Sequence, residues 1–455
     1  MNIDAARHGR AHVTAQMTDL TPPLTPLDEP PDAPLEELRR RDDAWHSTYR
    51  AEALWPGLDA VVIQASANAI GAAVPDVLRG APAHLAFAAT TPDAERDARA
   101  VGVAALLTGV GPLLGAWIEG GALETEPRLA RVLARHLAHA RAREARIRNA
   151  VIPVLARMER AGLEPGVIKG FHTAQVYFPE PGARPFSDVD VVVPPTAVSE
   201  AERLLDEAGF VPQQRVGATS YKREWLPPDG PGEVWSYELW HARSGWKLDL
   251  HDGLNFAAVM QNVSARQVPR FTERLTIDGV SLRVADPNEL IAVLAAHAST
   301  EIYSQRLLRL VELVLVVRRA SARGALDWHD VESSLAERGS LRFAYPMLAL
   351  AERLAPNTVD AALLSRLATA TTPRARAVTS TLSPTAPLLA PAFSLRGRLI
   401  WASDLRETIR RLWRMIAPLE GASRRRQLQT YRHRAIRLLT PDRSPRSRRD
   451  STPDG

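Results

Sequence analysis

Apolar residues recur at helical spacing over a long stretch in the first half of the chain. Within residues 126–161 they fall three or four positions apart, which predicts one long amphipathic helix. Pro153 lies inside this stretch and favours a kink, and Gly162 directly after it is a typical helix stop. Residues 45–121 show shorter helical stretches separated by prolines. We therefore expect a helical region over residues 45–160.

After residue 161 the pattern changes to short β-branched runs that alternate with helical stretches. Val167-Ile168 predicts a strand that ends at Lys169-Gly170, and residues 189–193 predict a buried strand. The further elements expected here are helices over 171–178 and 199–208, a hairpin of 235–240 with 246–251, and a second hairpin of 275–277 with 280–284 around Asp278-Gly279. The alternation predicts a small α/β core over residues 161–285.

Helical spacing returns at Asp286, which is a good N-cap and is followed by Pro287 at the first helical position. The pattern predicts helices over about 289–299 and 305–319 and further helix to 354. The regions expected outside the core are a disordered Pro-rich N-terminus (1–44), a helical region packed on the core (286–370), a linker with a basic helical segment (371–440) and a disordered basic tail (441–455). The predicted fold class is α+β, a small mixed-sheet core between large helical segments.

The composition is that of an ordinary soluble protein. The chain has 455 residues, 45% hydrophobic and 24% charged, and no cysteine. Disulfides, cysteine metal sites and cysteine nucleophiles are therefore excluded. No basic-then-apolar leader pattern opens the chain, so a cytoplasmic location is expected. The uncharged run over residues 100–118 contains glycines and small apolar residues, which favours a buried helix pair broken at Gly111-Pro112 over a membrane span, and no stable membrane insertion is expected.

The basic residues are unevenly distributed. Only Lys169, Lys222 and Lys247 are lysines, and the other 54 of the 57 basic residues are arginines. From Arg396 onward there are 16 arginines and 6 acidic residues. Such a segment is either a footprint for RNA or another anionic surface, or a solubilising end.

Three aspartates are placed as ligands for a divalent metal. In Ser187-Asp188-Val189-Asp190, the two aspartates lie two positions apart at the start of a strand, so their side chains point to one face. Asp249, between Leu248 and Leu250, supplies a third carboxylate from a later strand. Oxygen ligands of this kind suit Mg²⁺.

Residues 167–210, through Ile168-Lys169-Gly170 and Phe186-Ser187-Asp188-Val189-Asp190, resemble the uncharacterised bacterial nucleotidyltransferase family of the DNA polymerase beta-like superfamily. The strand with Asp249 resembles the family's third-carboxylate motif, and the stretches with His297 and with residues 306–312 resemble its later part. The similarity covers about residues 149–354.

The resemblance implies a metal-dependent enzyme that moves NMP from an NTP, such as ATP, to a hydroxyl or phosphate acceptor with release of pyrophosphate. Asp188, Asp190 and Asp249 would be the catalytic metal ligands, with Mg²⁺ or Mn²⁺ as cofactor, and Asp249 would help to deprotonate the acceptor. Lys169, Gly170 and Ser187 would bind the nucleotide. Many members of the superfamily have Gly-Ser at this turn, where the Ser contacts phosphate, and this chain has Lys169-Gly170 instead, so that Lys169 would replace the Ser electrostatically.

Several alternatives stay open at this stage. The acceptor is a small molecule, a protein or an RNA end, and the oligomeric state is undetermined. A catalytically reduced nucleotide-binding or regulatory module of the same fold is the rival hypothesis. His251 and His297 have structural alternatives, Arg309 and Glu312 have the alternative of a plain surface or interhelix pair, and Trp235, Trp240 and Trp246 suit either base stacking or core packing.

Overall fold

The computed structural model describes residues 54–86, 94–213, 222–229, 236, 238–254, 268–298, 302, 306–384 and 399–409. The expected N-terminus over 1–44, the tail over 441–455, the basic segment from residue 410 onward and Trp235 lie outside these residues.

Helices dominate the part of the chain before the sheet. They are α3 (Ala60–Arg79), α4 (Ala94–Thr108), α5 (Gly111–Glu119) and α6 (Pro127–Arg160), with the short parallel strands β1 (His84–Leu85) and β2 (Glu124–Thr125). The predicted long helix is confirmed: α6 runs uninterrupted through Pro153 and stops before Gly162, whose φ is +74°.

Two segments of this region have apolar compositions that suit a membrane. Among the described helices, α3 alone is long and apolar enough to cross one, and 39% of its most apolar window is buried within the protein. Helices α4 and α5 pass the same test only together, but they meet at an angle of 113°. Helix α5 begins at Gly111-Pro112, so the predicted break in the run 100–118 is confirmed.

A seven-stranded mixed sheet forms the centre of the α/β unit. Its strands are β3 (Gly166–Ile168), β4 (Asp188–Val192), β5 (Val211–Pro212), β6 (Lys222–Leu226), β7 (Lys247–His251), β8 (Glu273–Ile277) and β9 (Val280–Val284), in the order β5-β6-β7-β4-β3-β9-β8. The pairs β4–β7 and β3–β9 are parallel, and the others are antiparallel. Helices α7 (Gly170–Val176) and α8 (Val198–Glu207) and the short turns η2 (Pro181–Ala183) and η3 (Pro195–Ala197) connect them. The predicted α+β class is confirmed.

One predicted hairpin is wrong. The antiparallel partner of β7 is β6, and the described residues 236 and 238–240 form no strand. The sequence Lys-Arg-Glu-Trp-Leu of β6 contains no β-branched residue, so its own propensity does not indicate a strand. Its extended conformation depends on cross-strand pairing with β7.

Helices also follow the sheet. They are α9 (Pro287–Ala298), α10 (Leu307–Ala322), α11 (Trp328–Glu337), α12 (Leu341–Leu354), α13 (Ala361–Ala370) and α14 (Pro373–Thr381). Asp286 caps α9 as predicted, since its carboxylate accepts from the Asn288 backbone N–H at 2.9 Å. Residues 373–381, inside the region expected as a linker with a basic helical segment (371–440), form α14, because Thr372 caps this helix and Pro373 occupies its first turn.

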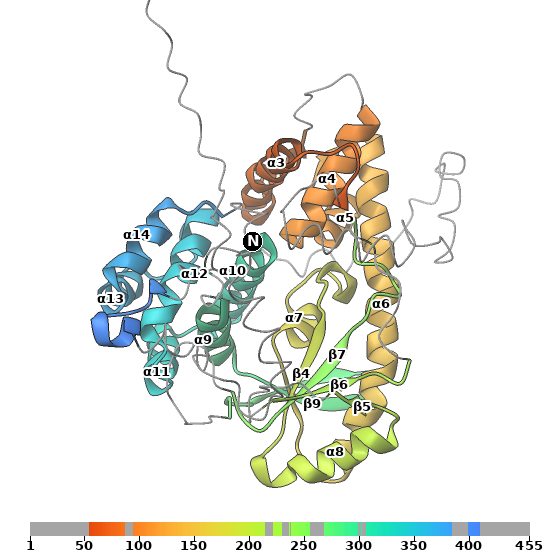
Figure 1. The fold of residues 1–455 in the computed structure, drawn as a ribbon, viewed down its shortest axis with the longest axis vertical. Coiled ribbons are helices and arrows are strands. Elements are labelled where there is room, and N and C mark those ends of the chain that lie inside the picture. The colour runs from red at the N-terminus through yellow and green to blue at the C-terminus, as the bar shows by residue number, and fades with distance from the viewer. Residues whose placement is uncertain are drawn as a thin grey trace, which may run out of the picture.

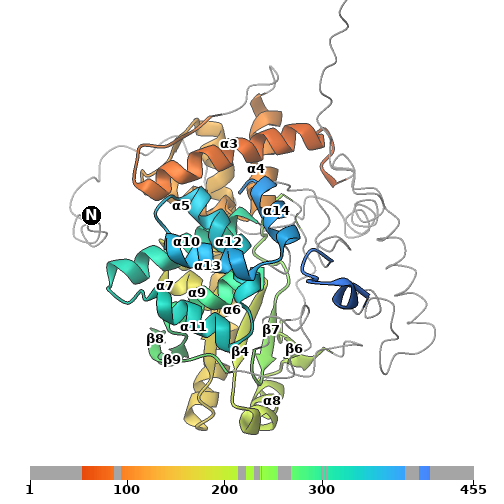
Figure 2. The same cartoon turned by 90° about the vertical axis from the view of Figure 1, so that its left-hand side faces the viewer.

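Two large hydrophobic cores and one smaller cluster, around Phe343 and Trp401, organise the described elements. The first joins the helices before the sheet to those after it, so the two helical regions form one packed body. The second lies between the sheet, α8 and the later half of α6. Helix α6 spans both, through Leu133 in the first core and Val151 in the second. Figure 1 shows α6 running along one side of the molecule, and Figure 2 shows α3 and α8 at opposite ends of it.

Candidate active site

The register between β4 and β7 brings two of the three predicted aspartates together. The strands are parallel, and Asp190 lies directly opposite Asp249. Because side chains alternate along a strand, Asp188 lies on the same face as Asp190. Val189 and Val191 point to the other face, into the second core. The carboxylates therefore occupy the face that is turned towards the first core, where Val192 and Ile168 are buried.

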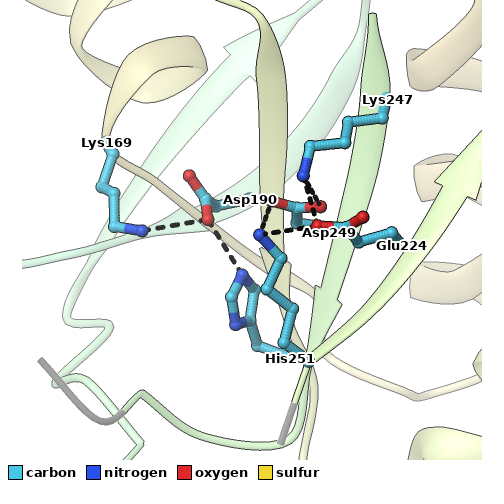
Figure 3. A network of polar contacts seen from close by, with 7 residues as sticks. Lys169, Asp190, Glu224, Lys247, Asp249 and His251 are labelled. Carbon is cyan, nitrogen blue, oxygen red and sulfur yellow. Dashed lines mark hydrogen bonds and ion pairs between the residues drawn. The ribbon is translucent and has the colours of Figure 1, made fainter. Parts of the chain in front are cut away.

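Asp190 lies between a lysine and a histidine. Its Oδ1 is 3.0 Å from Nζ of Lys169 and 2.9 Å from Nε2 of His251 (Figure 3). Lys169 follows β3, the antiparallel neighbour of β4, and His251 ends β7. The side chain of Asp190 is 5% exposed, so both contacts form in a site with little water.

Asp249 is fully buried and has two lysine neighbours. Its Oδ2 lies 2.5 Å from Nζ of Lys222, and its Oδ1 lies 3.1 Å from Nζ of Lys247. Both ammonium groups also contact Glu224, which lies directly opposite Asp249 on β6. Like charges directly opposite each other destabilise a sheet, and the two lysines offset the repulsion between these acids. The three lysines of the chain thus all surround the aspartates.

Burial and charge shift the pKa values of the two Asp-x-Asp carboxyls in opposite directions. Burial raises the pKa of Asp188, and the negative charges of Asp190 and Asp249 raise it further. Burial also acts to raise the pKa of Asp190, but the charge of Lys169 and the contact with His251 hold it well below its usual range. Asp190 is therefore a carboxylate at neutral pH, while Asp188 is the member of the pair that is most easily protonated.

The aspartates and His251 fit a divalent cation. Asp190, Asp249 and His251 each offer one ligand atom, and these atoms all lie within 4.8 Å of one another. Neither lysine contact of Asp249 has hydrogen-bond geometry, so within the described residues both of its oxygens keep acceptor capacity. Asp188 lies outside this closest group but within the electrostatic field of both aspartates. The two carboxylate oxygens suit hard cations such as Mg²⁺ or Mn²⁺, whereas an imidazole nitrogen is a more usual ligand for zinc and other transition metals.

The Lys169-Gly170 turn has an unusual backbone. Lys169 has φ +56° and ψ −132°, a conformation that L-residues rarely adopt. At Gly170, a Cβ would lie 2.9 Å from Nη1 of Arg184 and 3.0 Å from Cβ of Phe186. Position 170 therefore requires glycine because the side chains of Arg184 and Phe186 leave no room for a Cβ atom.

The remaining candidates take different places. Ser187 is exposed, and its carbonyl accepts from the Lys247 backbone N–H at 3.2 Å. His297, in the last turn of α9, has its pKa lowered by burial and then by the charges of Lys169 and Arg309. Trp246 packs edge-on against Phe210 in the second core.

The sequence placed Lys222 and Lys247 in the same segment as the aspartates, but it did not predict that these lysines and Glu224 surround Asp249. It left His251 as either structural or functional. One indication was available, because Lys247, Asp249 and His251 alternate along a single strand and therefore share a face. Lys222 and Glu224 carried no such indication, since their strand was not predicted.

Comparison with known proteins matches most of the described chain to one sequence family. The family model described as "Uncharacterised nucleotidyltransferase" matches residues 95–356, more than half of the chain. Among solved structures, the solution structure of the antibiotic-resistance factor ANT(2'')-Ia is similar over 43% of this chain and 93% of its own, with 14% sequence identity and a TM-score of 0.30. No curated protein matches the chain.

Proposed function

The chain belongs to the uncharacterised nucleotidyltransferase family, and from this premise we propose that it transfers NMP from an NTP, with ATP as one candidate, to a hydroxyl or phosphate acceptor. The observation that carries the proposal is the register of β4 against β7, which sets Asp190 opposite Asp249 with Asp188 on the same face. A DNA polymerase beta-like site and a bacterial, cytoplasmic enzyme are parts of the same proposal.

Asp188, Asp190 and Asp249 would hold divalent Mg²⁺ or Mn²⁺, with His251 available as a further ligand beside Asp190. When bound, the metal ions stabilise the charge on the entering and leaving oxygens of an in-line displacement. The low pKa of Asp190 keeps a carboxylate ready for this task, and Lys169 shields its charge before the nucleotide arrives.

The protein's own groups would then act on substrate. The acceptor oxygen forms a bond to the α-phosphorus, the bond between that phosphorus and the bridging oxygen breaks, and pyrophosphate leaves. Asp249 would take the acceptor's proton, and the ammonium of Lys169 and the hydroxyl of Ser187, which is exposed directly before β4, would contact phosphate oxygens.

A binding or regulatory module without turnover is the second candidate. It is favoured by the ammonium groups that already contact Asp190 and Asp249, because Lys169, Lys222 and Lys247 partly satisfy the charges that a metal would need. Such a module would bind nucleotide and release no pyrophosphate.

The experiment that separates the two incubates the full chain with each α-labelled NTP, Mg²⁺ or Mn²⁺, and cell extract. We expect pyrophosphate release and a labelled product, whose sensitivity to RNase or protease distinguishes an RNA, a protein or a small-molecule acceptor. Asp188→Asn and Asp190→Asn should reduce transfer by more than about 100-fold, because each removes a metal ligand. Asp206→Asn on the exposed surface of α8 is the matched control. Nucleotide binding with no product from any NTP would favour the second candidate.

A further inference from the structure

Arg143 of α6 contacts the backbone at the entrances of both aspartate-bearing strands. Its side chain is buried, at 2% exposure. Nη1 donates to the carbonyl of Phe186, and Nη2 donates to the carbonyl of Gly245 at 2.8 Å. Phe186 lies two residues before β4, and Gly245 lies two residues before β7. One guanidinium therefore links the starting points of two strands that are distant in sequence.

Two further contacts complete this link, which we call the strand clamp. Nε of Arg143 donates to the carbonyl of Ser244 at 3.3 Å, and the ring of Trp240 lies 5.1 Å from the guanidinium carbon. Directly beyond the clamp, the Lys247 backbone N–H donates to the Ser187 carbonyl at 3.2 Å. The planar guanidinium, with its five N–H donors in a rigid fork, suits several carbonyls at fixed angles, which an ammonium does not.

The charge of Arg143 is unfavourable where it lies. Burial and then the neighbouring charge of Arg146 lower its pKa to about 9, and only the charge of Asp188 acts in the opposite direction. No carboxylate of the described residues lies within ion-pair distance of it. A buried charge of this kind is rarely better for stability than an apolar side chain of similar volume. The role of Arg143 therefore lies in the strand geometry that its hydrogen bonds define and not in added stability.

We propose that Arg143 is a positioning residue for the aspartate site. By joining the entrances of β4 and β7, it sets the register and separation of Asp188, Asp190 and Asp249. The consequence of this inference for catalysis rests on the proposed function. The effect of the strand clamp on strand geometry does not depend on it. Residues that orient metal ligands from outside typically contribute 10- to 100-fold in metal affinity.

The test uses the full chain with Arg143→Gln and Arg143→Lys. Titration with Mn²⁺ alone should show affinity reduced by about 10- to 100-fold in Arg143→Gln, and by less in Arg143→Lys, which keeps the charge and some of the carbonyl contacts. Hydrogen exchange should become faster locally, in peptides that contain residues 187–190 and 246–249. If Arg143→Gln does not fold, the Mn²⁺ titration and the hydrogen exchange are both measured on Arg143→Lys.

The matched control is a change at Ile147, one turn further along α6 and fully buried in the second core. Ile147→Val or Ile147→Ala is chosen to lose as much stability towards urea as the Arg143 variant. It should keep Mn²⁺ affinity and the slow local exchange. Wild-type affinity and exchange in Arg143→Gln, or equal losses in the Ile147 control, overturn the proposal. If the wild-type chain itself binds no Mn²⁺, the proposed function fails, and the exchange measurement still decides for or against the clamp.

Discussion

Arg184 and Glu312 form a buried, two-pronged ion pair that joins the sheet unit to helix α10. Nε and Nη2 of Arg184 each lie 2.8 Å from one carboxylate oxygen of Glu312. Thr173 of α7 donates to the same carboxylate, and Arg184 packs against Gly170. The turn that carries Lys169 is thereby held against the helical body.

We expect Glu312→Gln to lower the free energy of unfolding by about 3 kcal/mol, because it leaves a buried guanidinium without an opposite charge. Urea unfolding measures the loss. The double variant Arg184→Met/Glu312→Leu should regain most of it. The exposed pair Arg366–Glu332 is the control, and Arg366→Met should change stability by at most about 1 kcal/mol. Equal effects at the two pairs would contradict the role given to the buried one.

Lys169→Ala should weaken NTP use by roughly 10- to 100-fold, taking a charge-assisted contact as about 1.5–3 kcal/mol. Lys169→Arg should also be impaired, because the bulkier planar group does not replace a compact ammonium. Lys169→Gly should lose the same activity but be more stable than Lys169→Ala by about 1 kcal/mol, because φ +56° strains any side chain. Steady-state kinetics and urea unfolding measure the two effects. Near-normal kinetics in the Ala and Arg variants would leave Lys169 as a turn residue only.

Lys222→Met should have opposite effects on stability and on metal binding. Without metal, the buried Asp249 loses its 2.5 Å ammonium neighbour, and we expect stability to fall by about 2 kcal/mol. Mn²⁺ affinity should rise by about tenfold, equivalent to about 1.4 kcal/mol, because a competing positive charge has been removed. Urea unfolding in the presence of EDTA measures the stability, and titration with Mn²⁺ measures the metal affinity. Lys222→Arg, which keeps the charge, is the control, and a fall in Mn²⁺ affinity in Lys222→Met would contradict the prediction.

His172 should make the protein less stable in mild acid. The imidazole is fully buried in α7 with no hydrogen-bond partner among the described residues, and burial lowers its pKa to about 3. The unfolded chain takes up this proton first as the pH falls, so stability is fully present above about pH 7 and is lost progressively towards pH 3. Between pH 7 and pH 5 the loss due to His172 is about 2 kcal/mol.

His172→Leu should remove that part of the pH dependence and leave stability at pH 7 unchanged or raised, because an unpartnered buried polar group is replaced by an apolar one. Urea unfolding at the two pH values measures it, with the exposed His329→Leu as control. A variant that loses as much stability as the wild type between pH 7 and pH 5 would show that His172 does not contribute.

The spacing of residues within single strands and at helix ends accounts for much of what the sequence predicted correctly. The alternation in Asp188-Val189-Asp190 places both aspartates on one face whatever lies beside the strand, since side chains alternate along any strand. The caps at Asp286 and Gly162 were readable for the same reason, because capping depends on a few neighbouring residues.

The sequence by itself determined the α+β class, the long helix α6 and the strands that carry the three aspartates, because hydrophobic periodicity and capping act over a single element. Only the tertiary structure decided that β6 pairs with β7, that Lys222 and Glu224 therefore join Asp249, and that the helices before and after the sheet share one core. Strand pairing and helix packing depend on contacts between residues far apart in the chain, and the free energy of these contacts overrides the weak propensity of a strand such as Lys222–Leu226.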